Sequence, residues 1–217
     1  KVYITTRENY EYSLTYDKDD PESKPDYEGL RKYSTDLRTG YNDFINKCSA
    51  VYGESSIGYG IFVEEELYAI ACVHIRNSIA YGITSKLAVK FRATSFLNRN
   101  KNRQMKCAIA AFINALMNGP DYSNGANQWD GAEQAMIPED MLDKPSNGRF
   151  MYKVNVMGWD IKEEHYISWK EAIDKKFGDG KFTVPQKQEA KFDYAKMHNK
   201  GKIRLFSTQQ LALTMFW

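Results

Sequence analysis

The sequence predicts a mainly helical α+β protein with a small β portion and an extension at each end. Helical periodicity carries most of this prediction, because apolar residues recur at three- and four-residue intervals within 36–53, 64–78 and 105–118. Alternation of polar and apolar residues predicts strands at 151–156 and 201–206. With 217 residues and 42% hydrophobic content, the chain is long enough to bury a core, and we expect one domain.

The amino-terminal part divides into an arm and a first helix. Residues 1–33 mix tyrosines with charges and helix breakers, which predicts a short strand or extended arm followed by a loop. The helix 36–53 is expected to begin at a polar capping residue within 34–36. Glu54 lies at its end.

Two further helices complete the core, which we place in residues 34–135. The helix 64–78 carries three glutamates in its first turn, where negative charge stabilises the positive end of the helix dipole. It is apolar on nearly all sides, so we expect it to lie buried at the centre. Residues 87–97 are compatible with a helix or with irregular structure, and the helix 105–118 ends at a Gly-Pro dipeptide.

Residues 136–217 form an accessory part in this prediction, with a helix between the two strands. The helix covers 168–177 and ends at a Gly-Asp-Gly turn. The final residues, 211–217, are mostly apolar, which favours a buried final strand over a partner-binding tail.

Charge is distributed unevenly, although the formal net charge is only +2. No aspartate or glutamate occurs from Leu67 through Pro120. A basic stretch of this kind attracts a polyanion, either nucleic acid or a wall polymer with free carboxylates, and the alternative is a solvated helix face with a loop. The basic residues of this stretch are Arg76, Lys86, Lys90, Arg92, Arg99, Lys101, Arg103 and Lys106.

Cysteine and histidine usage argues against a disulfide framework and a metal site. Cys48, Cys72 and Cys107 are odd in number and lie in apolar helical patterns, which predicts reduced, buried packing residues. The three histidines are isolated from other metal ligands, so we expect neither a metal nor a cofactor. No run of about 18 apolar residues occurs, so we expect no membrane span.

A carboxylate at a helix end is followed by a loop rich in amide and aromatic side chains. Glu54 closes the first helix, and the loop 121–130, here called the amide loop, follows the third. One acid can protonate a glycosidic oxygen while such a loop holds sugar rings, which indicates a candidate sugar-cleaving site. The alternative for the loop is a helix-terminating turn, in which an Asn-Gly pair adopts positive φ and the tryptophan packs in the core.

Three short motifs follow one another between residues 45 and 135. The first is Tyr52-Gly53-Glu54-Ser55-Ser56, and the second is Ala-Ile-Ala-Cys-Val-His-Ile-Arg-Asn over 69–77. The third is the stretch 115–129, which ends in Asp-Tyr-Ser-Asn-Gly-Ala-Asn-Gln-Trp. Their order and placement resemble the cell-wall hydrolase family typified by the spore cortex-lytic enzyme SleB. That family has Gly-Glu-Ala-Arg-Gly-Glu, then Val-Ala-x-Val-Ile-x-Asn-Arg, then Asp-Pro-Thr-x-Gly-Ala-x-x-aromatic. The family's Asn-Arg stands reversed in this chain.

The resemblance implies a lysozyme-like helical core and cleavage of the MurNAc-GlcNAc bond of peptidoglycan, with Glu54 as the catalytic acid. To hold its proton near neutral pH, such an acid needs a partly desolvated wall that raises its pKa above about 4.3. A muramidase also needs a second carboxylate, for which Glu64 is our first candidate, with Glu65, Asp121 and Asp130 as the others. The predicted substrate contacts are Ser56, Tyr59, Asp121, Tyr122, Asn127, Gln128 and Trp129.

Two alternatives to a muramidase stay open. In a lytic transglycosylase, the sugar's own C6 hydroxyl attacks in place of water and leaves 1,6-anhydro-muramic products. In a function of another class, the chain is a noncatalytic module that holds nucleic acid or a wall polymer through its basic stretch. No recognised nucleic-acid motif occurs, so we expect no specific nucleic-acid partner.

We expect a monomer that acts on peptidoglycan strands in the bacterial cell wall or periplasm. The chain begins with Lys1 and lacks the charged-then-apolar layout of a secretory signal, which suggests a piece of a longer protein. Two settings agree with this expectation: a secreted lysin, or the toxic module of a delivered antibacterial effector with a cognate immunity protein.

Overall fold

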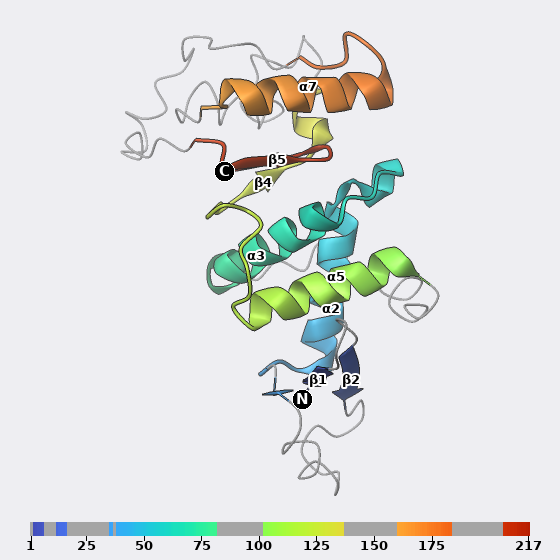
Figure 1. Cartoon of the computed structure of the whole chain (residues 1–217), viewed down its shortest axis with the longest axis vertical. Coiled ribbons are helices and arrows are strands. Elements are labelled where there is room, and N and C mark those ends of the chain that lie inside the picture. Colours follow the sequence, from blue (N-terminus) through green and yellow to red (C-terminus); the bar gives the residue numbers. More distant parts are fainter. Residues whose placement is uncertain are drawn as a thin grey trace, which may run out of the picture.

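The described part of the chain is a mainly helical α+β protein, as predicted (Figure 1). The computed structural model describes residues 2–6, 12–16, 35–36, 38–81, 102–136, 160–183 and 206–217. The predictions for 87–97, 151–156 and 201–205 lie outside the described residues. The elements in chain order are β1 (Val2–Thr6), β2 (Tyr12–Tyr16), β3 (Thr35–Asp36), α2 (Tyr41–Glu54), the 3-10 helix η2 (Ser56–Tyr59), α3 (Glu64–Tyr81), α5 (Arg103–Leu116), β4 (Trp129–Asp130), the 3-10 helix η5 (Ala132–Gln134), α7 (Glu163–Phe177), β5 (Gln209–Leu211) and β6 (Thr214–Phe216).

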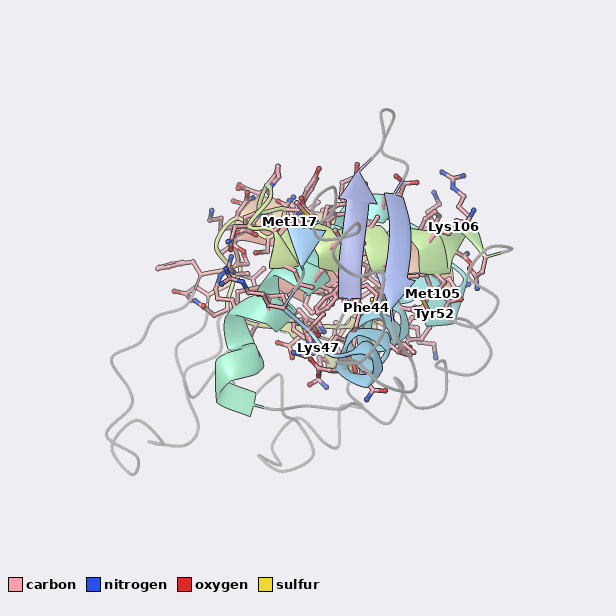
Figure 2. All side chains as sticks on the ribbon, turned by 90° about the horizontal axis from the view of Figure 1, so that it is seen from below. Phe44, Lys47, Tyr52, Met105, Lys106 and Met117 are labelled. Carbon is pink, nitrogen blue, oxygen red and sulfur yellow. The ribbon has the colours of Figure 1, made fainter. Side chains whose placement is uncertain are left out.

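Three helices form the core: α3 packs against α5, and α2 packs against both. The aromatic rings of Phe44 on α2 and Phe112 on α5 lie 5.7 Å apart between centroids. Figure 2, seen from below, labels Lys106 and Met117 toward the two ends of α5. The fully buried apolar residues of α3 are Leu67, Ala69, Ile70, Ala71 and Val73. The prediction of a central, buried helix is therefore confirmed.

The first core helix begins later than predicted. α2 starts at Tyr41 after Gly40, whose carbonyl accepts the N–H of Phe44 at 2.9 Å. The expected start at residue 36 is wrong, because Thr35 and Asp36 pair with β1 as the strand β3. Backbone groups committed to a sheet cannot at the same time begin a helix.

The amino-terminal arm forms an antiparallel sheet in the order β2-β1-β3. β1 pairs with β2 from Val2 opposite Tyr16 to Thr6 opposite Tyr12. Figure 1 shows this sheet at one end of the molecule, below the three helices. The predicted short strand in this arm is confirmed, and the structure adds a second strand to it.

The buried final strand predicted within 211–217 is confirmed as β6, but it is shorter than predicted, because residue 211 belongs to β5 and the segment is a hairpin. β5 and β6 pair antiparallel across a turn at Ala212 and Leu213, where Ala212 has a φ of 51°. The other edge of β6 pairs with β4, which completes a sheet in the order β4-β6-β5. The chain reverses because Ala212 adopts a left-handed backbone conformation, for which an alanine gives no sequence signal.

β6 separates two apolar clusters. Side chains alternate across a strand, so Phe216 joins the cluster of the three core helices, whereas Met215 and Trp217 join a second cluster beneath α7. The indole N–H of Trp169 on α7 donates to the Leu213 carbonyl at 2.8 Å. Figure 1 places the hairpin and β4 between α7 and the three-helix core.

Both later helices begin before their predicted starts. α5 begins at Arg103, where the side chain of Asn102 caps the helix by accepting the N–H of Met105 at 3.0 Å. α7 begins at Glu163 and ends at Phe177, and the φ of 94° at the following Gly178 confirms the expected Gly-Asp-Gly turn.

Candidate functional site

Glu54 is the last residue of α2, and its side chain is half-buried. The chain leaves the helix at Ser55, whose hydroxyl donates to the Tyr52 carbonyl at 2.8 Å. The same hydroxyl accepts the Ile57 N–H at 3.4 Å and so caps η2. These bonds fix the turn that follows the predicted catalytic acid.

A buried carboxylate holds the same turn. Both oxygens of Glu66 accept the Ser56 N–H at 3.1 Å, and Oε1 also accepts the hydroxyls of Ser56 and Thr214, each at 2.6 Å. The Ser56 hydroxyl accepts the N–H of Leu213 at 3.0 Å. Because a hydroxyl has a single proton, that of Ser56 donates to Glu66 while it accepts from Leu213.

Burial dominates the electrostatics of Glu66. Its side chain is 0% exposed, and burial raises its pKa to about 7 against the lowering effect of the hydrogen bonds from Ser56 and Thr214. A glutamate is almost never fully buried unless it is bonded. Carboxylates with strongly shifted pKa values concentrate at functional sites, which makes Glu66 a candidate beyond the predicted ones.

The spacing of apolar residues along α3 indicates that Glu66 is buried. This signal is easily overlooked, because Glu66 stands in a run of three glutamates that reads as an ordinary helix start. Ile70 and Val73 follow Glu66 by four and seven positions, and both are fully buried. Residues at this spacing share one face of a helix. The apolar stripe of α3 therefore extends back to a carboxylate.

Glu64, the first candidate for a second carboxylate, lies on the surface. Its carboxylate forms an ion pair with the Arg103 guanidinium at 2.9 Å, and both side chains are exposed. Glu65 is exposed as well. The buried member of the triplet is Glu66, and the catalytic role of Glu64 stays a prediction.

Asp121 organises the amide loop. Its Oδ1 accepts the N–H and the hydroxyl of Ser123 at 2.9 and 2.6 Å, and its Oδ2 accepts the Gly125 N–H at 2.9 Å and pairs with Arg76. Burial alone would raise the pKa of Asp121, but these hydrogen bonds and the Arg76 charge lower it to about 2. Asn124 and Gly125 have φ values of 52° and 82°, which confirms the positive-φ turn expected there.

The predicted substrate contacts of the amide loop differ in how accessible they are. Tyr122 is 38% exposed, its ring lies 4.9 Å from that of Tyr68 on α3, and Asn127 is also exposed. Gln128 is half-buried, and Trp129 packs against the three-helix core. Tyr122 and Asn127 therefore offer the most open stacking and amide groups of this set.

Two further predicted contacts, Tyr59 and Ser56, pack within the protein. The ring of Tyr59 meets Phe177 of α7 edge-on at 5.4 Å, and its hydroxyl lies 3.5 Å from Glu133. Burial and then the Glu133 carboxylate raise the pKa of Tyr59. Ser56 is 2% exposed with its hydroxyl bonded on both sides, so we assign it to fixing the turn in place of the predicted substrate contact.

The carboxyl-terminal hairpin connects the turn after Glu54 with the amide loop. Thr214, which binds the buried glutamate, is followed by Met215, which lies opposite Asp130 in the pairing of β6 with β4. Asp130 is buried and accepts the indole N–H of Trp217 at 2.9 Å. One continuous set of contacts thus joins the predicted acid to the predicted substrate loop.

The remaining sequence predictions concern the basic stretch, the cysteines and the absences. Arg76 and Arg103 each pair with a carboxylate, and most other residues of the basic stretch lie outside the described ones. Cys48 and Cys72 are buried and belong to no disulfide, as predicted, whereas Cys107 is half-buried. Within the described ranges, no three His, Cys, Asp or Glu side chains group as metal ligands, and no helix is long and apolar enough to cross a membrane.

Comparisons with known proteins found no family model, no curated protein and no solved structure that matches this chain. The resemblance to the cell-wall hydrolase family therefore rests on the three motifs and their order.

Proposed function

We propose that this chain cleaves the glycan strand of bacterial peptidoglycan, with Glu54 as the general acid. The observation that carries the proposal is the placement of Glu54 at the end of a core helix, half-buried and directly before a turn fixed by Ser55 and Glu66. General acid catalysis requires a proton donor held within hydrogen-bond reach of the leaving oxygen. The motif resemblance supplies the substrate class.

In this mechanism, protonated Glu54 donates to the oxygen that bridges MurNAc and GlcNAc. The bond between that oxygen and MurNAc C1 breaks, the leaving sugar keeps the proton, and an oxocarbenium-like MurNAc remains. In a muramidase, water then attacks C1 and a second carboxylate, predicted to be Glu64, takes the proton of the water. The product carries a reducing end.

The amide loop suits the sugar-binding part of this function. Tyr122 exposes a ring that can stack on a sugar face, with Tyr68 behind it, and Asn127 exposes an amide that can pair with an N-acetyl group. The hydrogen bonds of Asp121 hold the loop in one conformation before substrate arrives. A preorganised loop loses less conformational entropy on binding.

One observation favours a lytic transglycosylase as the second candidate. Of the four candidate second carboxylates, Glu64 is held in an ion pair, Asp121 in the hydrogen bonds of its loop, and Asp130 by a buried indole. The fourth, Glu65, is exposed on the surface of α3. A transglycosylase needs one acid only: the C6 hydroxyl of MurNAc attacks C1, and its proton returns to the Glu54 carboxylate. The product then carries a 1,6-anhydro ring and no water is consumed.

Digestion of purified peptidoglycan sacculi tests the proposal. We expect E54Q to lose at least about 100-fold in rate, as for removal of a general acid, while E171Q, which alters an exposed glutamate of α7, keeps wild-type activity. Mass analysis of the soluble fragments separates the two candidates, because hydrolysis leaves reducing ends and transglycosylation leaves 1,6-anhydro-muramic ends.

Two results would contradict the proposal. E54Q digestion at the wild-type rate would remove Glu54 from the mechanism. Absence of any soluble product from the wild type, together with salt-sensitive binding to sacculi or nucleic acid, would favour the noncatalytic polyanion-binding module. Because its proposed substrate lies there, we place the action of the protein in the cell wall or periplasm.

A further inference from the structure

We propose that Glu66 is a positioning residue for the catalytic acid: by binding Ser56 and Thr214 at once, it sets the turn after α2 against the carboxyl-terminal hairpin and so aims the Glu54 side chain. This inference rests on the proposed function. It gives a role to a buried group that the proposed reaction does not consume.

The path from Glu66 to Glu54 is short. Glu66 holds Ser56 through both its N–H and its hydroxyl, and Ser56 stands two positions after Glu54. Two consecutive α-carbon steps of about 3.8 Å leave these α-carbons no more than about 7.6 Å apart. Ser55 between them is itself bonded to Tyr52. A displaced Ser56 therefore moves the end of α2, and a shift of about 1 Å in a catalytic group costs about 100-fold in rate.

The arrangement carries a cost that packing alone does not explain. Glu66 is fully buried, and the groups that donate to it are neutral: one amide and the hydroxyls of Ser56 and Thr214. Burial raises its pKa to about 7, so ionisation near neutral pH works against folding. An apolar side chain on this stripe would avoid that cost. The donors around Glu66 are nonetheless satisfied by it, which fits a carboxylate kept for the geometry that it imposes.

The carboxyl-terminal hairpin also binds Ser56 and Glu66, from the far end of the chain. Leu213 donates to Ser56 across 157 positions of sequence, and Thr214 donates to Glu66 across 148. Through β6 the same hairpin pairs with β4, which closes the amide loop. One element thus contacts both the turn beside Glu54 and the loop predicted to hold the sugar. The carboxyl-terminal hairpin, which the sequence analysis assigned to the accessory part 136–217, therefore belongs to the site.

E66Q is the sharpest variant, because it keeps the size of the side chain and places an amide donor where Oε2 now accepts the Ser56 N–H. E171Q is the matched control, with the same change at an exposed glutamate of α7 that has no proposed role in the site. With soluble glycan-strand oligomers as substrate, we expect kcat of E66Q to fall about 100-fold and KM to stay within about threefold. The unfolding midpoint at pH 7.5 should lie within a few degrees of wild type or above it.

A second pair of variants covers the hairpin side of the contact. T214V keeps the shape of the side chain and removes one donor to Glu66, and we expect kcat to fall about 10-fold. T183V makes the same change at a half-buried threonine outside the site, whose hydroxyl donates to the Ala135 carbonyl at 3.0 Å, and should keep wild-type kcat. Hydrogen exchange of the Ser56 and Ile57 amides should be faster in E66Q and T214V than in either control.

The outcomes separate this inference from the proposed function. Wild-type kcat in E66Q, or a loss of activity that only follows a fall in the unfolding midpoint, would overturn the positioning role. If E54Q digests sacculi at the wild-type rate, the proposed function fails instead. Amide exchange then still decides whether Glu66 holds the turn, since unchanged Ser56 exchange in E66Q would overturn that contact's role as well.

Discussion

Glu66 and Asp121 accept similar sets of hydrogen bonds, yet their pKa values shift in opposite directions. Glu66 accepts one N–H and two hydroxyls and has its pKa raised to about 7, whereas Asp121 accepts two N–H groups and one hydroxyl and has its pKa lowered to about 2. Glu66 is fully buried among neutral groups, and Asp121 lies near the surface beside Arg76. The depth of burial therefore decides the direction: it outweighs the hydrogen bonds at Glu66, whereas at Asp121 the hydrogen bonds, helped by the Arg76 charge, outweigh it.

The comparison also separates two uses of a carboxylate. Asp121 stabilises the loop that it shapes, because its ionised form is favoured in the folded protein. Glu66 is disfavoured in its ionised form and still holds two distant segments together. A group kept at a cost to stability is the stronger candidate for a role in function.

Removal of the Glu66 side chain should have the largest effect. E66A leaves an N–H and two hydroxyls without their acceptor and opens a cavity in the core, so we expect a loss of about 3–5 kcal/mol in the free energy of unfolding at pH 5. Urea unfolding measures this loss, with E65A as a control that should stay within about 0.5 kcal/mol of wild type. A loss for E66A no larger than that of the control would contradict the hydrogen-bonding scheme.

The pH dependence of stability should follow from the raised pKa of Glu66. Between its ordinary pKa of 4.5 and about 7, the folded protein binds a proton that the unfolded chain does not bind. Its contribution to stability is therefore complete below pH 4.5 and is lost as the pH rises through 7, by about 3 kcal/mol in total. Urea unfolding of wild type and E66Q at pH 4.5 and pH 8 should show the difference between them fall by this amount. A difference that is independent of pH would show that burial does not control this group.

Asp121 should show the opposite and smaller pH dependence. Its lowered pKa makes its contribution complete above pH 3.8 and lost as the pH falls through about 2. Because the side chain is partly exposed and screened by solvent, we expect D121N to lower the free energy of unfolding by only about 1 kcal/mol at pH 7. The deficit should disappear near pH 2, and a deficit that persists there would mean that the charge of Asp121 does not matter.

The surface pair of Glu64 and Arg103 should have the smallest effect on stability. Both side chains are exposed, so E64Q should change the free energy of unfolding by less than about 0.5 kcal/mol in thermal or urea unfolding. Sacculus digestion by the same variant sharpens the mechanism. A large loss of activity at unchanged stability would establish Glu64 as the second carboxylate, and retained activity would favour the transglycosylase.

Local sequence patterns predicted the existence of the described helices better than their ends. Helical periodicity found α2, but Thr35 and Asp36 pair with β1, a segment some thirty positions earlier, and this pairing moved the start of the helix to Tyr41. The extent of the final strand was overestimated for a different reason, because the reversal at Ala212 has neither glycine nor asparagine to mark it. In the first place a contact between distant segments overrides local preference, and in the second a local turn carries no sequence signal.

Some features of the candidate site could likewise be predicted from neighbouring residues, and others depend on distant segments. The place of Glu54 at a helix end and the positive-φ turn of the amide loop follow from neighbouring residues. The hydrogen-bond partners of Glu66 do not, since Ser56 and Thr214 lie 10 and 148 positions away from it. Ser56 looked available for substrate because the sequence alone does not show the hairpin that covers it.

β6 also has a consequence for the thermal unfolding of this protein. Neighbouring side chains of the strand belong to different apolar clusters, so the unfolding of one cluster exposes apolar side chains of the other. We therefore expect these two clusters to unfold as one cooperative unit, although they lie on opposite sides of a thin sheet.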